Sequence, residues 1–256
     1  MPEKTEDSQF NVLNYTSKQE HQLRERLLEL FLETPIPKEQ ILSNIGLFLN
    51  SKTLSRLLFF DFLYRQILDV MGVICEFGTR WGPNLGELIS LRGIYEPYNR
   101  HRKIIGFDTF SGFPAISKED GSADMMEVGH LRTPDEYFKY LTEVLDLLEK
   151  ENPLAHIKKH EIIKGDVSVT LPQYLEKNPE TIISFAYFDL DLYQPTKFTL
   201  HLIKDRLVKG SVLGFDELND PDSPGETLAL METFGLNNVK LKRFPFASRN
   251  SYFVVE

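Results

Sequence analysis

Cysteine, positive charge and long apolar runs are all scarce in this sequence. A single cysteine, Cys75, cannot form an internal disulfide, and the opening residues lack the apolar stretch of a signal peptide, so we expect a cytoplasmic protein. The chain has 29 lysine and arginine residues against 38 acidic residues, which gives a net charge of −9. This charge argues against a protein whose main task is to bind nucleic acid or an anionic membrane. The apolar runs fall far short of the roughly 20 residues that span a bilayer. We therefore expect a soluble protein with no nucleic-acid or membrane partner.

Histidine clusters and the glycine motif of dinucleotide-binding proteins are missing too. The six histidines are scattered without metal-ligand spacing, and only His130 is retained as a candidate substrate contact or alternative base. The glycine turn at 76–82 has Arg80 where Gly-x-Gly-x-x-Gly would have its second glycine. This departure weakens the interpretation as an NAD-dependent oxidoreductase, which stays an alternative.

A chain of 256 residues can bury one sizeable hydrophobic core and carry a small additional subdomain. Apolar residues recur at helical spacing from residue 17, which predicts helices ending before Pro35, over 38–50 and over 53–70. After Gly72 the pattern changes to short apolar runs that alternate with helical ones. We predict an N-terminal helical extension or lid over residues 1–70 and one α/β domain over 71–256. The apolar stripes of the extension need a partner surface, which predicts a homo-oligomer.

Five apolar runs, at 72–78, 103–108, 161–166, 182–189 and 211–216, predict strands joined by helices. Such alternation is typical of a mostly parallel, doubly wound sheet, in which ligands bind at the carboxyl ends of the strands. Four of the five runs end on an aspartate, so we expect these aspartates to converge on one edge. Two final runs, at 239–244 and 252–255, predict an antiparallel hairpin joined by a polar turn at 248–251.

The glycine turn, Glu-Phe-Gly-Thr-Arg-Trp-Gly at 76–82, predicts a nucleoside cofactor site, because its glycines let a ligand approach the backbone. S-adenosylmethionine carries an amino group, a ribose and an adenine, which acidic residues can accept. Glu76, or a neighbouring carbonyl, suits the amino group, Asp108 the ribose and Asp166 the adenine. Each aspartate could instead only cap the helix that follows it.

A second acidic group follows the fourth and fifth strands. Asp189 and Asp191 end one run, and Asp216 and Glu217 end the next, so up to four carboxylates meet and repel one another unless a cation compensates. Oxygen ligands alone favour Mg²⁺, for which we nominate Asp189, Asp216 and Glu217. Asp191 is the candidate general base, and the competing interpretation is that it faces solvent or caps the helix that follows.

The segment at 111–132 is glycine-rich and polar, too irregular for an ordinary strand-to-helix connection. Loops of that length are usually functional or disordered. We interpret it as an active-site lid.

These motifs together resemble those of a known family. The glycine turn, Asp-Thr-Phe-Ser-Gly-Phe-Pro at 108–114, Phe-Asp-Leu-Asp-Leu-Tyr at 188–193 and Phe-Asp-Glu at 215–217 are similar to motifs of the macrocin O-methyltransferase family, over roughly residues 72–225. The resemblance is strongest to nucleotide-linked 6-deoxyhexose (rhamnose-type) 3-O-methyltransferases of antibiotic biosynthesis.

The resemblance implies a Rossmann-like class I methyltransferase fold, dependence on S-adenosyl-L-methionine and a divalent metal, and a deoxysugar substrate, either on a nucleotide or in a glycoside. It matches Asp189, Asp216 and Glu217 to the metal positions and Asp191 to the general base. The candidate cofactor-binding residues are then Glu76, Gly78, Thr79, Arg80, Trp81, Asp108, Thr109, Asp166 and Asp189.

Some features depart from the family or leave alternatives open. Many members have two aspartates where this chain has Asp216 and Glu217, and their glycine turn often reads Trp-Arg-Gly-Gly. A catechol-type methyltransferase would usually carry a lysine just after the first metal aspartate, where this chain has Leu-Asp-Leu at 190–192. The missing lysine favours a carboxylate base. A diphosphate substrate would want arginines, for which Arg132, Arg243 and Arg249 are candidates. A catechol-like methyltransferase, an oxidoreductase and a non-catalytic binding module remain alternatives.

Overall fold

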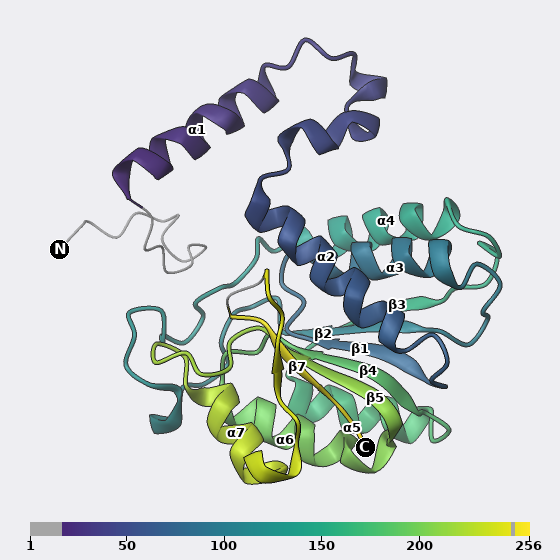
Figure 1. Cartoon of the computed structure of the whole chain (residues 1–256), viewed down its shortest axis with the longest axis vertical. Coiled ribbons are helices and arrows are strands. Elements are labelled where there is room, and N and C mark those ends of the chain that lie inside the picture. Colours follow the sequence, from purple (N-terminus) through teal and green to yellow (C-terminus); the bar gives the residue numbers. More distant parts are fainter. Residues whose placement is uncertain (1–16, 247–248) are drawn as a thin grey trace.

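A seven-stranded sheet forms the centre of the structure, a computed structural model that describes residues 17–246 and 249–256. The strand order is β3-β2-β1-β4-β5-β7-β6. The first five strands pair in parallel, and β7 pairs antiparallel with both β5 and β6. This arrangement confirms the predicted Rossmann-like methyltransferase sheet with an antiparallel C-terminal hairpin (Figure 1).

The strands span Val73–Phe77 (β1), Ile104–Asp108 (β2), His160–Lys164 (β3), Ile183–Phe188 (β4), Leu207–Phe215 (β5), Lys242–Arg243 (β6) and Ser251–Val254 (β7). The α-helices span Lys18–Leu32 (α1), Ser51–Gln66 (α2), Pro83–Tyr95 (α3), Tyr137–Lys150 (α4), Val167–Lys177 (α5), Tyr193–Ile203 (α6) and Gly225–Thr233 (α7). Short 3₁₀ helices lie at Lys38–Gln40 (η2), Leu42–Phe48 (η3), Lys118–Asp120 (η4), Lys204–Arg206 (η5) and Leu236–Asn238 (η6).

Helices cover both faces of the sheet. α2, α3 and α4 lie on one face, and α5, α6 and α7 lie on the other (Figure 1). The strand residues alternate between the two resulting cores: Ile74 packs with the first set of helices, while Cys75 and Phe77 pack with the second. The carboxyl ends of the parallel strands are left uncovered by this layering, and the loops that follow them build the site.

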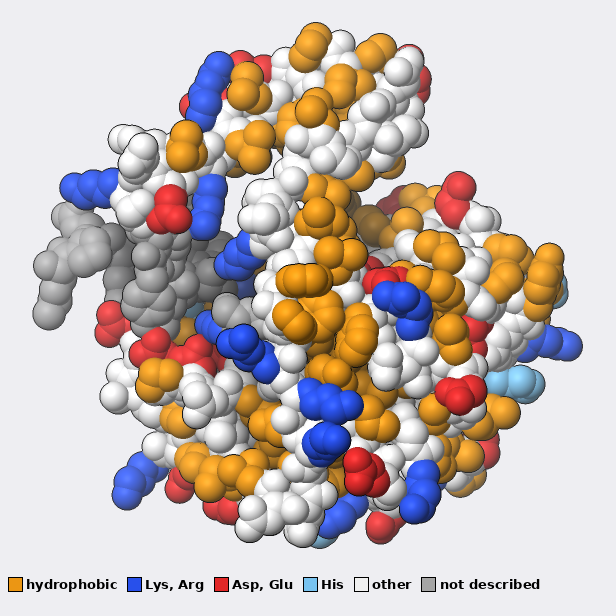
Figure 2. All heavy atoms as spheres, viewed as in Figure 1, with side chains coloured by type: hydrophobic (Ala, Val, Ile, Leu, Met, Phe, Trp, Pro, Cys, Tyr) orange, Lys and Arg blue, Asp and Glu red, His pale blue; other side chains and the backbone are white. Residues whose placement is uncertain are grey.

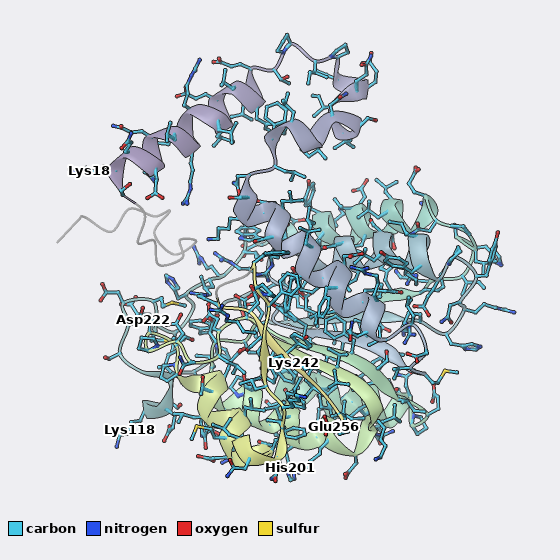
Figure 3. All side chains as sticks on the ribbon, in the orientation of Figure 1. Lys18, Lys118, His201, Asp222, Lys242 and Glu256 are labelled. Carbon is cyan, nitrogen blue, oxygen red and sulfur yellow. The ribbon has the colours of Figure 1, made fainter. Side chains whose placement is uncertain are left out.

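The predicted helical extension divides into two parts with different packing. Phe59, Phe60, Leu63 and Tyr64 of α2 are fully buried in the same core as the sheet. The N-terminal arm, residues 17–50, differs, because α1 has no buried residue and projects from the domain (Figures 1 and 3). The proposed domain boundary at residue 70 stays a prediction, and residues 1–16 lie outside the described part.

Three predicted elements differ in extent from the structure. Residues 38–50 form two 3₁₀ helices rather than one α-helix, because no packed face stabilises a longer helix there: η3 has no buried residue. The helix predicted over 53–70 begins at Ser51 and ends at Gln66. The first hairpin strand is only Lys242–Arg243, and Ser248 of the predicted turn is outside the described residues. In the described part of the chain, none of the helices is both long and apolar enough to cross a membrane.

Candidate active site

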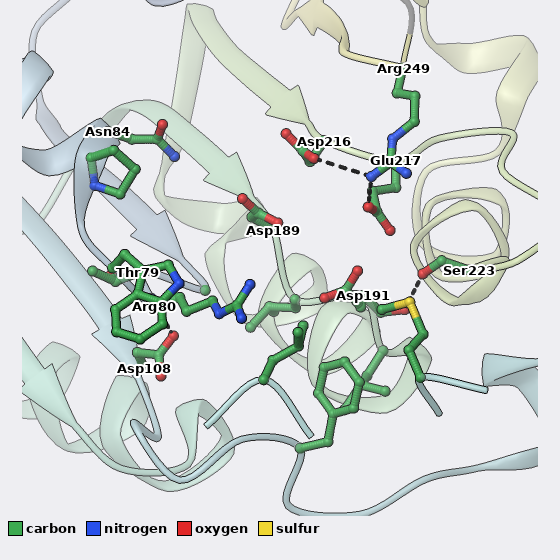
Figure 4. A pocket seen from close by; sticks show the side chains of 18 of the residues that line it. Thr79, Arg80, Asn84, Asp108, Asp189, Asp191, Asp216, Glu217, Ser223 and Arg249 are labelled. Carbon is green, nitrogen blue, oxygen red and sulfur yellow. Dashed lines mark hydrogen bonds and ion pairs between the residues drawn. The ribbon is translucent and has the colours of Figure 1, made fainter. Parts of the chain in front are cut away.

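A pocket of about 870 Å³ opens at the carboxyl ends of the parallel strands. The four strand-end aspartates, Asp108, Asp166, Asp189 and Asp216, all line it, so they converge as the sequence predicts. Its other walls come from Glu20 and Arg24 of α1, the first turn of α2, the segment at 111–132, the loop after β5 and the connection between β6 and β7. Figure 4 shows the labelled side chains around this space.

The glycine turn passes close beneath the strand that carries the acidic centre. Gly78 has a positive φ of +94°, and a Cβ at this position would lie 1.8 Å from the Asp189 carbonyl oxygen. Only glycine tolerates such an approach. Gly78 N also donates to Phe107 O at 2.9 Å, and Asp189 N donates to Phe77 O at 2.8 Å. The ends of β1, β2 and β4 are thereby joined at the pocket floor.

Asp108 organises the turn while it faces the pocket. Its Oδ2 accepts from the Arg80 backbone N at 2.8 Å, and its Oδ1 accepts from Phe110 N at 2.6 Å. Burial raises the pKa of Asp108, and these backbone donors oppose the shift. The pocket is also lined by Gly78, Thr79, Arg80, Trp81 and Thr109.

Asp166 serves two purposes that the sequence left as alternatives. It caps α5, because its Oδ1 accepts from Ser168 N at 2.8 Å. It also lines the pocket beside Gly165 and Val167. A helix cap and a ligand contact are therefore compatible at this position.

Glu76 lies behind the pocket wall, not in it. Its side chain is fully buried, and burial raises its pKa to about 8. Oε1 accepts from Asn84 Nδ2 at 2.6 Å, and Asn84 is the residue that lines the pocket. The sequence motifs do not single out Asn84, although its place in the first turn of the helix after the glycine turn was a usable signal. Any contact of Glu76 with a cofactor passes through Asn84 in this arrangement.

Arg56 of α2 stands at the centre of the acidic group. Its Nη1 lies 2.6 Å from Asp216 Oδ1, and its Nη2 lies 3.2 Å from Asp189 Oδ2. Its Nε donates to Asn84 Oδ1 at 3.0 Å, which connects the acidic centre with the first turn of α3. The guanidinium also lies 5.8 Å from the centre of the Tyr187 ring. Arg56 belongs to none of the sequence motifs and is missed there, because 133 positions separate it from Asp189.

The two carboxylates that share Arg56 have opposite pKa shifts. Burial raises the pKa of Asp216, but the charge of Arg56 and hydrogen bonds from Tyr187 and Arg56 outweigh it, so the pKa lies below its ordinary value. Burial and the neighbouring Asp216 raise the pKa of Asp189 well above its ordinary value. Of the two carboxylates, Asp216 makes the shorter contact with the arginine.

Arg249 supplies a second cation from the connection between β6 and β7. It forms an ion pair with Glu217 and lies 3.6 Å from Asp216 Oδ2 (Figure 4). It also lies 3.3 Å from Asp220 Oδ2. Of the three arginines nominated for phosphate binding, Arg249 lines the pocket, whereas Arg132 and Arg243 are not among its lining residues.

These pairings bear on the predicted Mg²⁺ site. Within residues 17–246 and 249–256, no group of three His, Cys, Asp or Glu side chains is placed to hold a metal ion. Asp189 and Asp216 both form ion pairs with Arg56, and Glu217 forms an ion pair with Arg249. The carboxylates need a compensating cation, as expected, but the cations present are guanidinium groups. As arranged, these residues do not fit Mg²⁺.

Asp191 is buried at 5% exposure, lines the pocket and has a left-handed backbone with φ +61°. Burial and the charge of Asp216 raise its pKa to about 6, against the opposing charges of Arg249, Arg80 and His130. Ser223 Oγ donates to its carbonyl oxygen at 3.1 Å. It is not a helix cap, because the N-cap of α6 is Leu192. A carboxyl with a pKa near neutrality in a pocket is suited to proton transfer.

The segment at 111–132 forms one side of the pocket, and its role as a lid stays a prediction. Phe113 and Met125 pack with Leu192 in a small apolar cluster, and both line the pocket. Asp120 is buried, and its Oδ1 accepts from Tyr193 N at 2.6 Å at the start of α6. His130 does not line the pocket, although its charge reaches Asp191.

Known structures resemble this chain over most of its length. A structure of CalS11, described as a calicheamicin methyltransferase, is 43% identical with a TM-score of 0.92 and covers 94% of each chain. An apo structure of CalS11, described as a TDP-rhamnose 3'-O-methyltransferase of calicheamicin biosynthesis, is 41% identical with a TM-score of 0.84, over 94% of this chain and 96% of that one. The O-methyltransferase NovP, at 17% identity and a TM-score of 0.58 over 78% and 79% of the two chains, shares the fold. No protein-family model matches the sequence, and no curated protein does.

Proposed function

The chain belongs to the family of S-adenosylmethionine-dependent sugar O-methyltransferases that includes CalS11, and we propose that it methylates the 3-hydroxyl of a nucleotide-linked 6-deoxyhexose in natural-product biosynthesis. The observation that carries this proposal is the identity of 43% over 94% of both chains. TDP-rhamnose, the substrate named for CalS11, is the first substrate to test.

In this proposal the cofactor lies over the glycine turn. Asp108 accepts hydrogen bonds from the ribose, and Asp166 accepts one from the adenine amino group. Thr79, Arg80, Trp81 and Thr109 complete this end, with Asp189 beside the sulfonium and Glu76 acting through Asn84. The support is that all of these residues except Glu76 line one pocket.

Asp191 acts as the general base of the proposed reaction. Its carboxylate takes the proton of the sugar hydroxyl while the oxygen forms a bond to the methyl carbon. The bond from that carbon to sulfur breaks, and its electron pair stays on sulfur as a neutral thioether. Methyl transfer needs in-line alignment more than covalent help, so the pocket contributes chiefly by positioning both reactants. Asp191 is well suited because its pKa of about 6 leaves it ionised at neutral pH.

The Mg²⁺ assigned to Asp189, Asp216 and Glu217 stays a proposal, and no step above depends on it. Binding would require Arg56 and Arg249 to release these carboxylates. Calorimetric titration with Mg²⁺, run in parallel on wild type and Asp216→Asn, tests it directly. Heat of binding in wild type that disappears in the variant supports the assignment. Full methylation in EDTA, without binding heat, excludes it.

The substrate is tested by a methylation screen of TDP-linked 6-deoxyhexoses and of matching glycosides, with products identified by NMR. A methyl group on O3 of the nucleotide-linked sugar supports the proposal. Methylation of the glycosides alone would refute the nucleotide-linked substrate. Calorimetry with S-adenosylmethionine, S-adenosylhomocysteine and NAD separates a methyltransferase from an oxidoreductase.

A homo-oligomer is proposed from the surface of the N-terminal arm. Leu23, Leu32, Leu42 and Leu47 are each more than 60% exposed there. Hydrophobic side chains are visible along the arm in orange in Figure 2. Apolar residues gathered on a projecting segment are typical of a subunit interface. A monomer measured by light scattering at micromolar concentration would contradict this proposal.

A further inference from the structure

One wall of the pocket differs in chemistry from the acidic centre. Ser51 and Lys52, in the first turn of α2, and Phe246, in the connection between β6 and β7, all line it. Among the residues that the structure describes, Lys52 forms no ion pair with a carboxylate, whereas Arg56 and Arg249 are both paired. The pocket that holds the acidic centre is therefore also lined by a lysine without a carboxylate partner and by an aromatic ring.

Phe246 is exposed but firmly supported. It is 68% exposed, and its ring packs edge-on against Phe244 with centroids 5.4 Å apart. Phe244 is buried and packs against Phe59 and Phe62 of α2, at 5.2 and 5.3 Å. These contacts tie the connection to α2. An exposed ring on a buried aromatic support, at the mouth of a pocket, is a platform for a flat ligand.

We propose that this wall is the nucleotide subsite: the Phe246 ring stacks on the pyrimidine base, and Lys52, with the Ser51 hydroxyl, binds the diphosphate. The inference rests on the proposed nucleotide-linked substrate. A diphosphate is repelled by Asp189, Asp191 and Asp216, so it has to lie away from the acidic centre while the sugar reaches it. Arg249 is three positions beyond Phe246 on the same connection and pairs with Glu217, so one short segment spans from the base to the sugar.

The test measures calorimetric binding of TDP alone, and KM for TDP-rhamnose, in wild type, Phe246→Ala, Phe246→Tyr and Lys52→Ala. Loss of one base-stacking ring is expected to weaken TDP binding about tenfold or more, and tyrosine should restore it. Lys52→Ala should weaken TDP binding and flatten its dependence on salt. The affinity for S-adenosylhomocysteine should not change, which also shows that each variant is folded. Phe198→Ala, an exposed phenylalanine of α6 away from the pocket, is the matched control.

The outcomes separate this subsite from the proposed function. If wild type methylates TDP-rhamnose but Phe246→Ala and Lys52→Ala keep the wild-type KM and TDP affinity, the subsite is refuted and the function stands. If wild type neither binds TDP nor methylates nucleotide-linked sugars, both proposals fail. A rise in KM and in the TDP dissociation constant, in those two variants only, supports the subsite.

Discussion

Glu226 Oε1 accepts a hydrogen bond from the backbone N–H of Leu190 at 2.9 Å. The contact joins the start of α7 to the residue that precedes Asp191. Glu226 is fully buried, and burial raises its pKa to about 8. Because Asp191 has an unfavourable left-handed backbone, its conformation depends on such neighbours. Glu226 is therefore expected to position Asp191, the proposed base, without touching the substrate.

Two replacements of Glu226 should separate the effect of its hydrogen bond to Leu190 from the effect of its charge. Glu226→Gln keeps an acceptor oxygen for Leu190 N, so turnover should stay within a few-fold of wild type. Glu226→Ala leaves the partly buried N–H of Leu190 without this partner, which costs about 1–3 kcal/mol of stability. It should also lower kcat with little change in the affinity for S-adenosylhomocysteine. Steady-state kinetics and urea unfolding measure both effects. Equal kcat in the alanine variant and wild type would contradict the positioning role.

The raised pKa of Glu226 also predicts how stability depends on pH. The folded protein keeps a proton up to about pH 8, whereas the unfolded chain releases it near the ordinary value of 4.5. The contribution of Glu226 to the free energy of unfolding is therefore greatest below about pH 4.5. It falls as the pH rises from about 4.5 to about 8, and it no longer changes above about pH 8. Between pH 6 and pH 9, the free energy of unfolding measured with urea should fall less in Glu226→Gln than in wild type. Glu143→Gln, at an exposed site on α4, is the control and should keep the wild-type loss.

Asp191 should control the pH dependence of turnover. A base must be ionised to accept a proton, and the pKa of Asp191 is about 6. We therefore expect kcat to rise with pH through about 6 and to be level above it. Asp191→Asn should lower kcat at least about 100-fold, the usual contribution of general base catalysis, with the affinity for S-adenosylhomocysteine unchanged. A variant that methylates at the wild-type rate would remove Asp191 from the mechanism.

Arg56 should matter for stability as well as for the site. Arg56→Met removes the cation shared by Asp189 and Asp216 and should lower the free energy of unfolding by about 1–3 kcal/mol, since hydrogen bonds to charged groups are lost. Arg56→Lys keeps the charge but cannot reach both carboxylates and Asn84, so it should restore only part of the loss. Arg65→Met is the control on the same helix, because Arg65 makes only an exposed pair with Asp61. Arg65→Met should change the free energy of unfolding by no more than about 0.5 kcal/mol.

The strands and the convergence of their aspartates could be predicted from the sequence. Short apolar runs that alternate with helical ones specify a parallel sheet, and parallel strands bring their carboxyl ends to one edge. Asp108, Asp166, Asp189 and Asp216 could therefore be placed at one site from the strand pattern alone, and all four line one pocket. The local pattern also placed Gly78 in a turn, where the fold requires a residue without Cβ.

Which groups pair within that site was decided only by the tertiary structure. Arg56 reaches Asp189 and Asp216 because α2 packs its buried aromatic face on the sheet, a contact between segments more than 130 positions apart. Likewise, Glu76 lies behind Asn84, and Asp120 of the segment at 111–132 accepts a hydrogen bond from Tyr193 N. Sequence periodicity fixes which way a strand or helix faces. The distances between charges depend on how separate elements pack, and these distances decide whether arginine or a metal ion compensates the carboxylates.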